Sequence, residues 1–432
     1  MNEDFLHYVW KYRLFDQSDL KTTKDEAIRI LHPGEHNLNA GPDFFNAKIK
    51  YADTLWVGNV EIHIKASDWR KHFHQEDEAY NNVVLHVVLE DDEEISSRNG
   101  NLVPALELKY RILPHVLSNY RLLDSGKSLI PCGSGITDVP SFILSSWLER
   151  LMIERLEEKT KVIKESLIEN HSNWEETFYY FLAQNFGFRI NAQPFLQLAK
   201  SLPLNLLAKH RSSLLQLEAL LFGQSGMLSE TFSGKYPREL QNEYAFLMHK
   251  NSLRPMQKEA WKFLRMRPGN FPSLRIAEFA SLIHTSSALF SRIIESGSIE
   301  ELKSFFKVNV SEYWKTHYVF DRQSVAKEKR VGEEALENIL VNTAIPFLFI
   351  YGKEKKQEAY CKKALGFLES LNAEDNSTIR KFVSLGIKPR DALQGQAMLQ
   401  LYNRYCSLKK CLHCSVGNQL LSKNKERQHS VY

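Results

Sequence analysis

Cysteine, charge of one sign and long apolar runs are all scarce in this chain of 432 residues. The five cysteines are an odd number, and Asn2, Glu3 and Asp4 stand where an export signal would need positive charge and an apolar segment. A disulfide framework is therefore not expected. We expect a cytoplasmic protein.

Apolar runs such as residues 83–89 are far shorter than the roughly 20 residues that cross a bilayer, so no membrane partner is expected. The net charge of +4 is too small to indicate nucleic-acid binding by itself. Hydrophobic residues at 43% and charged residues at 25% are typical of a globular protein. The length predicts two or three domains, at about 150 residues each.

Residues 1–125 mix helix and strand patterns, which predicts an α/β domain. A helix is expected at 3–15, and strands are expected at 27–31, 44–51, 55–64 and 83–89. A polar and partly helical connection, 68–80, joins the last two strands.

Residues 126–140 are rich in Gly, Ser and Pro, and they predict a linker. Residues 141–432 predict an all-α region of one or two subdomains, so the fold class is α+β overall. After a long helix from 141 to about 161, helices are expected at 174–186, 194–199, 212–222, 239–251, 273–283, 286–295, 300–306, 333–349, 354–371 and 391–405.

The segments Gly41-Pro42-Asp43 and Val60–Lys65 carry the clearest chemical pattern. Side chains alternate faces along a strand, so Glu61, His63 and Lys65 share the face opposite the apolar residues. With Asp43 at the end of a neighbouring strand, Asp43 and Glu61 can bind one divalent metal ion through oxygen ligands.

Asp43 and Glu61, with the order helix, strands, crossover and strand, resemble the PD-(D/E)xK nuclease superfamily over about residues 1–110. Glu3 or Glu35 would supply the further acid that some members carry. The resemblance implies Mg²⁺ or Mn²⁺ held by Asp43 and Glu61, and hydrolysis of phosphodiester bonds in DNA or RNA.

The motif expects lysine two residues after the second acid, where this chain has His63. His63 would then orient or deprotonate the attacking water, and Lys65 or Lys48 would stabilise charge on the phosphate. Histidine in place of the motif lysine also fits a non-enzymatic nucleic-acid or protein interaction module with a degenerate site.

Histidines allow a second interpretation of the same domain. His63, His74, Asp77 and His86 could converge on a zinc or manganese ion, since imidazole binds softer metals than magnesium. The chain would then be a hydrolase of a substrate other than nucleic acid. A histidine within an apolar strand, such as His86, is also typical of a hydrogen-bonded core residue.

Three of the five cysteines, Cys406, Cys411 and Cys414, lie within nine residues. Such spacing predicts a site for Zn²⁺ or an iron–sulfur cluster. The fourth ligand would be Cys361, His413 or His429. Some nucleases related to the superfamily above have a four-cysteine cluster split between distant segments, and Cys361 with the C-terminal trio is similar to that arrangement. Buried thiols in a helical core are the simpler alternative.

Basic residues gather at 250–275, where Lys258, Lys262, Arg265 and Arg267 could contact a phosphate backbone. An exposed aromatic there could stack on a base, but a solvated basic face around a buried Trp261 explains the spacing as well. Over nearly its full length the chain also resembles a bacterial protein family of unknown function. A metal-dependent nuclease is the leading expectation.

Overall fold

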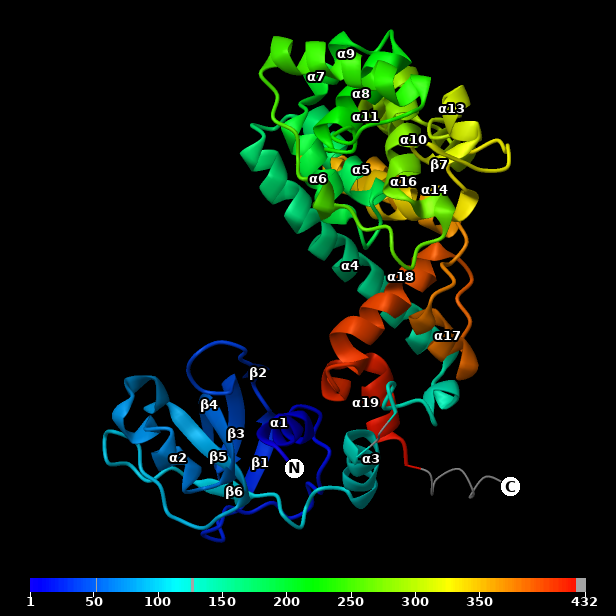
Figure 1. Cartoon of the computed structure of the whole chain (residues 1–432). Coiled ribbons are helices and arrows are strands. Elements are labelled where there is room, and N and C mark those ends of the chain that lie inside the picture. The colour runs from blue at the N-terminus through cyan, green and yellow to red at the C-terminus, as the bar shows by residue number, and fades with distance from the viewer. Residues whose placement is uncertain (52, 126–127, 425–432) are drawn as a thin grey trace. The chain divides into compact units, whose positions relative to one another are not determined.

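The computed structural model describes residues 1–51, 53–125 and 128–424, and its chain forms two compact units (Figure 1). Unit 1 contains Met1–Trp147 and the C-terminal segment that starts at Leu401, and unit 2 contains Leu148–Gln400. The chain is 53% helical and 12% strand, which confirms the α+β class. Of the predicted linker, 126–140, the described residues 128–140 fall within unit 1, and the unit boundary lies inside α4 (Ser141–Glu169).

Unit 1 is built on one mixed sheet. Its elements are α1 (Glu3–Lys11), β1 (Ile28–His32), β2 (Glu35–His36), β3 (Phe44–Tyr51), β4 (Thr54–Lys65), α2 (Asp68–Lys71), η1 (His74–Glu76), η2 (Glu78–Tyr80), β5 (Val83–Glu90), β6 (Ala105–Glu107), α3 (Pro114–Ser125), η3 (Ile136–Asp138), η7 (Tyr402–Cys406), η8 (Cys411–His413) and α19 (Ser415–Ser422).

The strand order in this sheet is β1-β3-β4-β5-β6, and β2 pairs with β3. β1, β3 and β4 are antiparallel, whereas β4, β5 and β6 are parallel. Parallel neighbours need a crossover connection, and α2, η1 and η2 form it between β4 and β5. The four strands predicted from the sequence are present to within a residue or so at each end, and the short β2 and β6 are additional.

Both faces of β4 and β5 are buried at the centre of the sheet. Val60 and Ile62 are at most 1% exposed on one face, and Glu61 and His63 are 4% and 1% exposed on the other. α1 and α2 both contact β4. The face expected to carry the chemistry is therefore enclosed.

Asn2 caps the start of α1, because its side chain accepts a hydrogen bond from the Phe5 N–H at 3.1 Å. The helix buries Phe5, Leu6, Val9 and Trp10. It ends at Lys11, earlier than the predicted residue 15, since Arg13 adopts a left-handed φ of 54°.

Unit 2 is helical apart from one hairpin. Its elements are the rest of α4, α5 (Trp174–Phe186), α6 (Ala192–Ser201), α7 (Leu204–Lys209), α8 (Leu214–Gln224), α9 (Lys235–Asn251), η4 (Lys258–Ala260), η5 (Pro268–Asn270), α10 (Pro272–Thr285), α11 (Leu289–Glu295), α12 (Ile299–Ser304), α13 (Glu312–Lys315), β7 (His317–Val319), β8 (Arg322–Gln323), α14 (Glu333–Ile339), η6 (Leu340–Ala344), α15 (Ile345–Glu354), α16 (Glu358–Glu369), α17 (Ser377–Ser384) and α18 (Ala392–Leu401). The β7–β8 hairpin corrects the all-α prediction.

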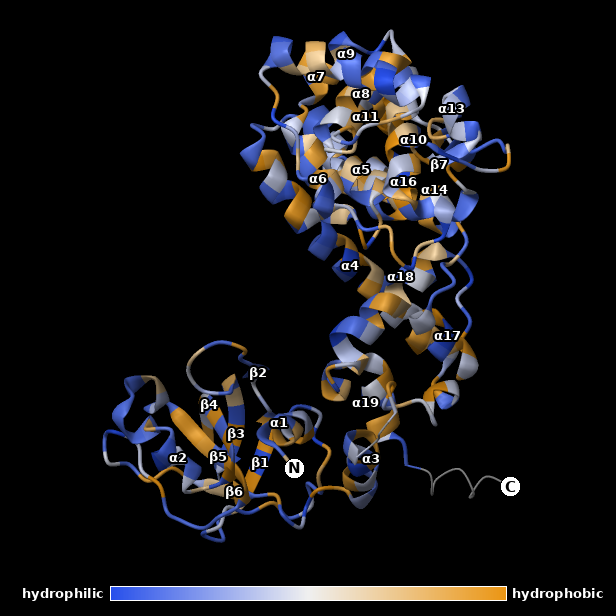
Figure 2. Ribbon diagram, in the orientation of Figure 1, coloured by the Kyte–Doolittle hydropathy of each residue, from blue (hydrophilic) through white to orange (hydrophobic). Residues whose placement is uncertain are grey.

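Apolar faces build the core of unit 2. Figure 2 shows hydrophobic and hydrophilic residues alternating along α4, as in an amphipathic helix. Residues Glu333–Glu354 form a continuous helix of 22 residues that is long and apolar enough to cross a membrane, but 78% of its most apolar window is buried inside the protein. The core helix of a folded domain can be equally long and apolar.

Arg275 and Glu278 form a buried ion pair in α10. The Arg275 Nη1 atom lies 2.7 Å from Glu278 Oε2, with the two side chains 5% and 1% exposed. Asn270 accepts a further hydrogen bond from Arg275 at 2.8 Å, and the guanidinium lies 4.7 Å from the Phe188 ring centroid. Arg275 is therefore a structural cation.

We expect Arg275→Ala to lower the free energy of unfolding of unit 2 by about 3–5 kcal/mol, because Glu278 would be left buried without its partner. Arg254→Ala is the matched control, since Arg254 is exposed in the same basic segment. Urea denaturation followed by circular dichroism measures the difference. Equal midpoints for the two variants would contradict the prediction.

Candidate metal centre

Two hydrogen bonds tie Asp43 to Glu61 and Ile62 of β4, where β3 begins beside β4. The Asp43 N–H donates to Glu61 Oε2 at 3.1 Å, and the Ile62 N–H donates to Asp43 Oδ2 at 2.9 Å. The β3–β4 register shifts just beyond this point, between Phe44 and Ala47. The structure thus brings together the two carboxylates that the sequence singled out.

The loop before β3 presents Asp43. The Asn37 side-chain amide donates to the backbone oxygens of Asn39 and Pro42 at 3.1 and 3.0 Å. Gly41 has a φ of 99°, a conformation that favours glycine. The Gly-Pro-Asp sequence therefore shapes a tight loop that positions the aspartate.

Three imidazoles gather beside Glu61. His74 Nε2 lies 3.1 Å and His63 Nε2 lies 3.6 Å from Glu61 Oε1. One nitrogen atom each from His63, His72 and His74 lies within 4.8 Å of the others. His63 comes from β4, whereas His72 and His74 come from the crossover that starts with α2 (Figure 1).

His86 supports His63 from the neighbouring strand. The parallel register pairs Glu61 with His86, and His63 Nδ1 lies 2.8 Å from His86 Nε2. On its other side, His63 Nε2 lies 3.1 Å from His72 Nδ1. Since His86 is fully buried and His72 is exposed, this chain of rings runs from the core to solvent.

Aromatic side chains of the crossover cover the histidines. Tyr80 stacks on His74 with 3.8 Å between ring centroids, and Trp69 lies 5.4 Å from His86. Trp69 and Tyr80 belong to a small buried cluster with Val83, Ile95 and Val103. This cover keeps water away from the inner side of the centre.

α1 contributes the other edge of the centre. His7 Nε2 lies 3.2 Å from Asp43 Oδ2, and the His7 ring lies 5.5 Å from that of His36. Glu3 is one helical turn before His7, and its carboxyl feels the charges of His72, His7 and Asp43. Two distant segments thus meet at Asp43.

Burial dominates the electrostatics of the carboxyl groups. It raises the pKa of Glu61 far above its usual value, and the nearby Asp43 charge raises it further. Burial likewise raises the pKa of Glu3, although His72 and His7 oppose the shift. A cation placed between these groups would offset the cost of ionising them.

Burial has the opposite effect on the imidazoles. It lowers the pKa of His63 to about 2, and the neighbouring histidines add to the shift. It lowers the pKa of His86 to about 3 and also lowers that of His74. His7 differs, because burial lowers its pKa but the hydrogen bond and charge of Asp43 raise it overall. His63, His74 and His86 are therefore neutral near pH 7.

Some predicted site residues lie elsewhere. Lys65 is exposed, with its ammonium 3.9 Å from Asp92, because it ends β4 beyond the enclosed face. Asp77 is exposed, and its side chain caps η2 by accepting a hydrogen bond from the Ala79 N–H. His86 backs His63 instead of facing the group of three. Glu35 is exposed in β2.

His7 and His72 complete the centre, although the sequence did not single them out as ligands. His7 follows Glu3 by four residues, so both lie on one face of α1. His72 stands two residues before His74 in the crossover. Those spacings are the signals that point to them.

The cysteines of the predicted set fall in both units. Cys361 lies in unit 2, where its thiol is 3.5 Å from the Phe349 carbonyl, whereas Cys406, Cys411 and Cys414 lie in unit 1. Cys132, also in unit 1, lies close enough to Cys406 for its charge to raise the pKa of that thiol. His429 lies outside the described residues.

The basic residues predicted to bind nucleic acid differ in their contacts. Lys258 forms an ion pair with Glu230, and Lys262, Arg265 and Arg267 are exposed. Trp261 is only 5% exposed and donates from its indole to the Ser225 carbonyl at 2.8 Å. The tryptophan is therefore a core residue and does not offer a surface for base stacking.

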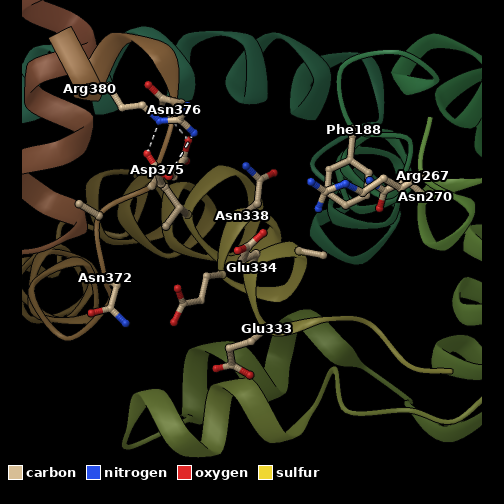
Figure 3. A pocket seen from close by; sticks show the side chains of 15 residues that line it. Phe188, Arg267, Asn270, Glu333, Glu334, Asn338, Asn372, Asp375, Asn376 and Arg380 are labelled. Carbon is tan, nitrogen blue, oxygen red and sulfur yellow. Dashed lines mark hydrogen bonds and ion pairs between the residues drawn. The ribbon is translucent and has the colours of Figure 1, made fainter. Parts of the chain in front are cut away.

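Arg267 also lines a pocket of about 750 Å³ in unit 2. Figure 3 shows Arg267 and Phe188 at one end, the ion pair of Arg380 with Asp375 at another, and Glu333 and Glu334 along the lining. The lining also includes Glu337 and Glu374. So many carboxylates favour a positively charged group over a phosphate backbone.

The chain is an α+β protein whose mixed sheet carries an enclosed histidine–carboxylate cluster. Its residues 3–377 match a family described as a protein of unknown function, DUF2851, and the chain belongs to that family. This agrees with the resemblance noted from the sequence. No curated protein and no solved structure matches the chain significantly.

We expect Asp43→Ala to loosen β4, because the Ile62 N–H would lose its acceptor, at a cost of about 1–3 kcal/mol. Asp43→Asn retains a side-chain oxygen as acceptor and serves as the control. Hydrogen exchange of the Ile62 amide measures the effect. The idea fails if both variants exchange at the wild-type rate.

Proposed function

We propose that the protein is a metal-dependent hydrolase that cleaves phosphodiester bonds in nucleic acid. The observation that carries the proposal is the convergence of His63, His72 and His74, with nitrogens within 4.8 Å of one another, beside the Glu61 carboxylate. Nitrogen and carboxylate ligands in this arrangement fit one divalent ion.

The ligand types favour Mn²⁺ or Zn²⁺. Carboxylates alone would suit Mg²⁺, but three imidazoles suit a softer ion. His63 is oriented for this role by His86, in the way that ligand histidines are usually held by a second hydrogen bond. Exposed His72 marks the side open to substrate.

A bound ion would polarise the phosphate and lower the pKa of a water molecule. The protein's own groups would orient the reaction around it. Asp43 lies next to Glu61 and holds His7, so His7 is available to donate a proton to the leaving oxygen. His63 stands where the superfamily motif expects lysine, and because it is neutral it serves better as a ligand than as a cation.

The order of elements supports the choice of substrate. α1 precedes three antiparallel strands, β1, β3 and β4, and a crossover leads to β5 parallel to β4. The same order underlies the resemblance to PD-(D/E)xK nucleases, with Asp43 and Glu61 at the motif positions. Phosphodiester cleavage is thus the preferred reaction.

We expect His86→Leu to weaken metal binding about 10–100-fold, because His63 would lose the partner that orients it. Asp77→Asn should bind as the wild type does, since its side chain can still cap η2. Calorimetric titration with Mn²⁺ and Zn²⁺ measures both variants. Equal affinities for His86→Leu and the wild type would remove the support for His63 as a ligand.

We expect the wild type to cleave labelled single- or double-stranded DNA or RNA with Mn²⁺ or Zn²⁺ and to work poorly with Mg²⁺. Glu61→Gln and His74→Ala should lose at least 100-fold, roughly what loss of an electrostatic catalytic group costs. Lys65→Ala should retain activity, because Lys65 lies away from the centre. Activity that survives in Glu61→Gln would place the reaction elsewhere.

One observation favours a second candidate, a hydrolase of a substrate other than nucleic acid. Among the described residues, the hydrogen bonds and ion pairs of Asp43, Glu61 and His63 involve no lysine or arginine that would hold a phosphate. Metal binding without nucleic-acid cleavage, together with turnover of small ester substrates, would favour it. Salt-sensitive nucleic-acid binding without turnover would instead favour an interaction module.

A further inference from the structure

Four of the five cysteines converge in unit 1 from two segments that are far apart in the sequence. Cys132 follows α3, whereas Cys406 ends η7, Cys411 begins η8 and Cys414 precedes α19. In all six pairs the thiols are close enough for the charge of one to raise the pKa of another. Cys361 has no part in this set.

Packing holds the two segments together independently of the thiols. A Cβ atom on Gly135, three residues after Cys132, would lie 3.2 Å from Leu420 of α19. The Asn119 side chain of α3 donates to the carbonyls of Leu420 and Lys423, both at 3.0 Å. The convergence therefore belongs to the fold of unit 1.

Three of the four thiols are buried, Cys411 is half-buried, and none of them forms a disulfide. Cys132, Cys406 and Cys414 are 5–7% exposed, and all four are free. Burial raises the pKa of Cys132 to about 12 and that of Cys411 to about 11, and neighbouring thiols add to both shifts. Free thiols gathered from two packed segments form the donor set that a thiolate metal site uses.

Backbone N–H groups surround the Cys414 thiol. Its thiol faces the N–H groups of Val416 and Gly417 at the start of α19, and these hydrogen bonds lower its pKa against the effect of burial. A Cβ on Gly417 would lie 2.1 Å from the Cys411 carbonyl oxygen, so only glycine allows this close turn. Backbone N–H groups aimed at sulfur tune metal-bound thiolates.

The distances between the sulfur atoms distinguish a zinc ion from an iron–sulfur cluster. Four thiolates around one zinc ion, with bonds of about 2.3 Å, stand about 3.8 Å apart. Among the described residues, no three of these sulfur atoms lie within 4.8 Å of one another. An iron–sulfur cluster holds its cysteines farther apart, since each binds a different iron.

We propose that Cys132, Cys406, Cys411 and Cys414 bind a [4Fe–4S] cluster that fastens the C-terminal segment to the turn after α3. The same segment touches α1, where the Tyr8 hydroxyl lies 3.3 Å from the Asn418 carbonyl. The cluster thereby stabilises the side of unit 1 that also presents Glu3 and His7. It is separate from the histidine centre and does not depend on the proposed hydrolysis.

The test is anaerobic purification of the full chain, with visible absorption and assays of iron, acid-labile sulfide and zinc. We expect about four irons and four sulfides per chain. Cys132→Ser should lose most of the iron and the visible absorption, and the matched Cys361→Ser should retain both. His74→Ala should also retain them, which separates this cluster from the histidine centre.

Cys411→Ser is the second variant should Cys132→Ser fail to fold, because Cys411 is only half-buried. Reconstitution with ferrous iron and sulfide should restore the absorption in the wild type and not in Cys411→Ser. One zinc per chain without iron would overturn the proposal. So would a folded wild type that takes up no iron on reconstitution, or equal losses in Cys361→Ser and Cys132→Ser.

Discussion

Two hydrogen bonds hold the centre of unit 1 in place. The Asp43 N–H donates to the Glu61 carboxylate, and the Ile62 N–H donates to the Asp43 carboxylate. In an antiparallel pair the ladder is normally made by backbone groups alone. Here each carboxylate accepts a backbone N–H from the other strand. Neither can turn toward solvent without leaving that N–H unpaired, so the two carboxyl groups stay together.

The parallel pairing of β4 and β5 has a second effect on the same site. Parallel strands require a crossover, and this crossover passes over the face that carries Glu61 and His63. It brings His72 and His74 as additional imidazoles and Trp69 and Tyr80 as cover. One topological requirement therefore supplies imidazoles and encloses the cluster. The resulting burial explains why the pKa of His63 is low and that of Glu61 is high.

The two ends of the described chain meet in unit 1. α1 lies against the C-terminal segment through Tyr8 and Asn418, and Asn119 of α3 caps α19. The proposed cysteine cluster would add a covalent link between these regions. Because His7 lies in α1, any contact that holds α1 in place also holds His7 beside Asp43.

The sequence by itself determined the strands and the acidic pair. Apolar alternation marked β3 and β4 to within a residue, because a half-buried strand requires that period, and a continuous apolar run marked the central strand β5. The same alternation put Glu61 and His63 on one face, and the Gly-Pro-Asp turn marked Asp43. α5 was likewise predicted with its observed bounds, since Asn173 caps its start and Gly187 follows its end.

Only the tertiary structure decided which distant side chains meet. Lys65 lies two residues from His63 yet leaves the site, because β4 ends there and its side chain reaches solvent. His7 and His72 join the site from α1 and the crossover, and Cys132 replaces Cys361 beside the C-terminal cysteines. Local pattern follows from backbone geometry, but the closeness of residues far apart in the sequence depends on how whole elements pack, which local spacing alone does not determine.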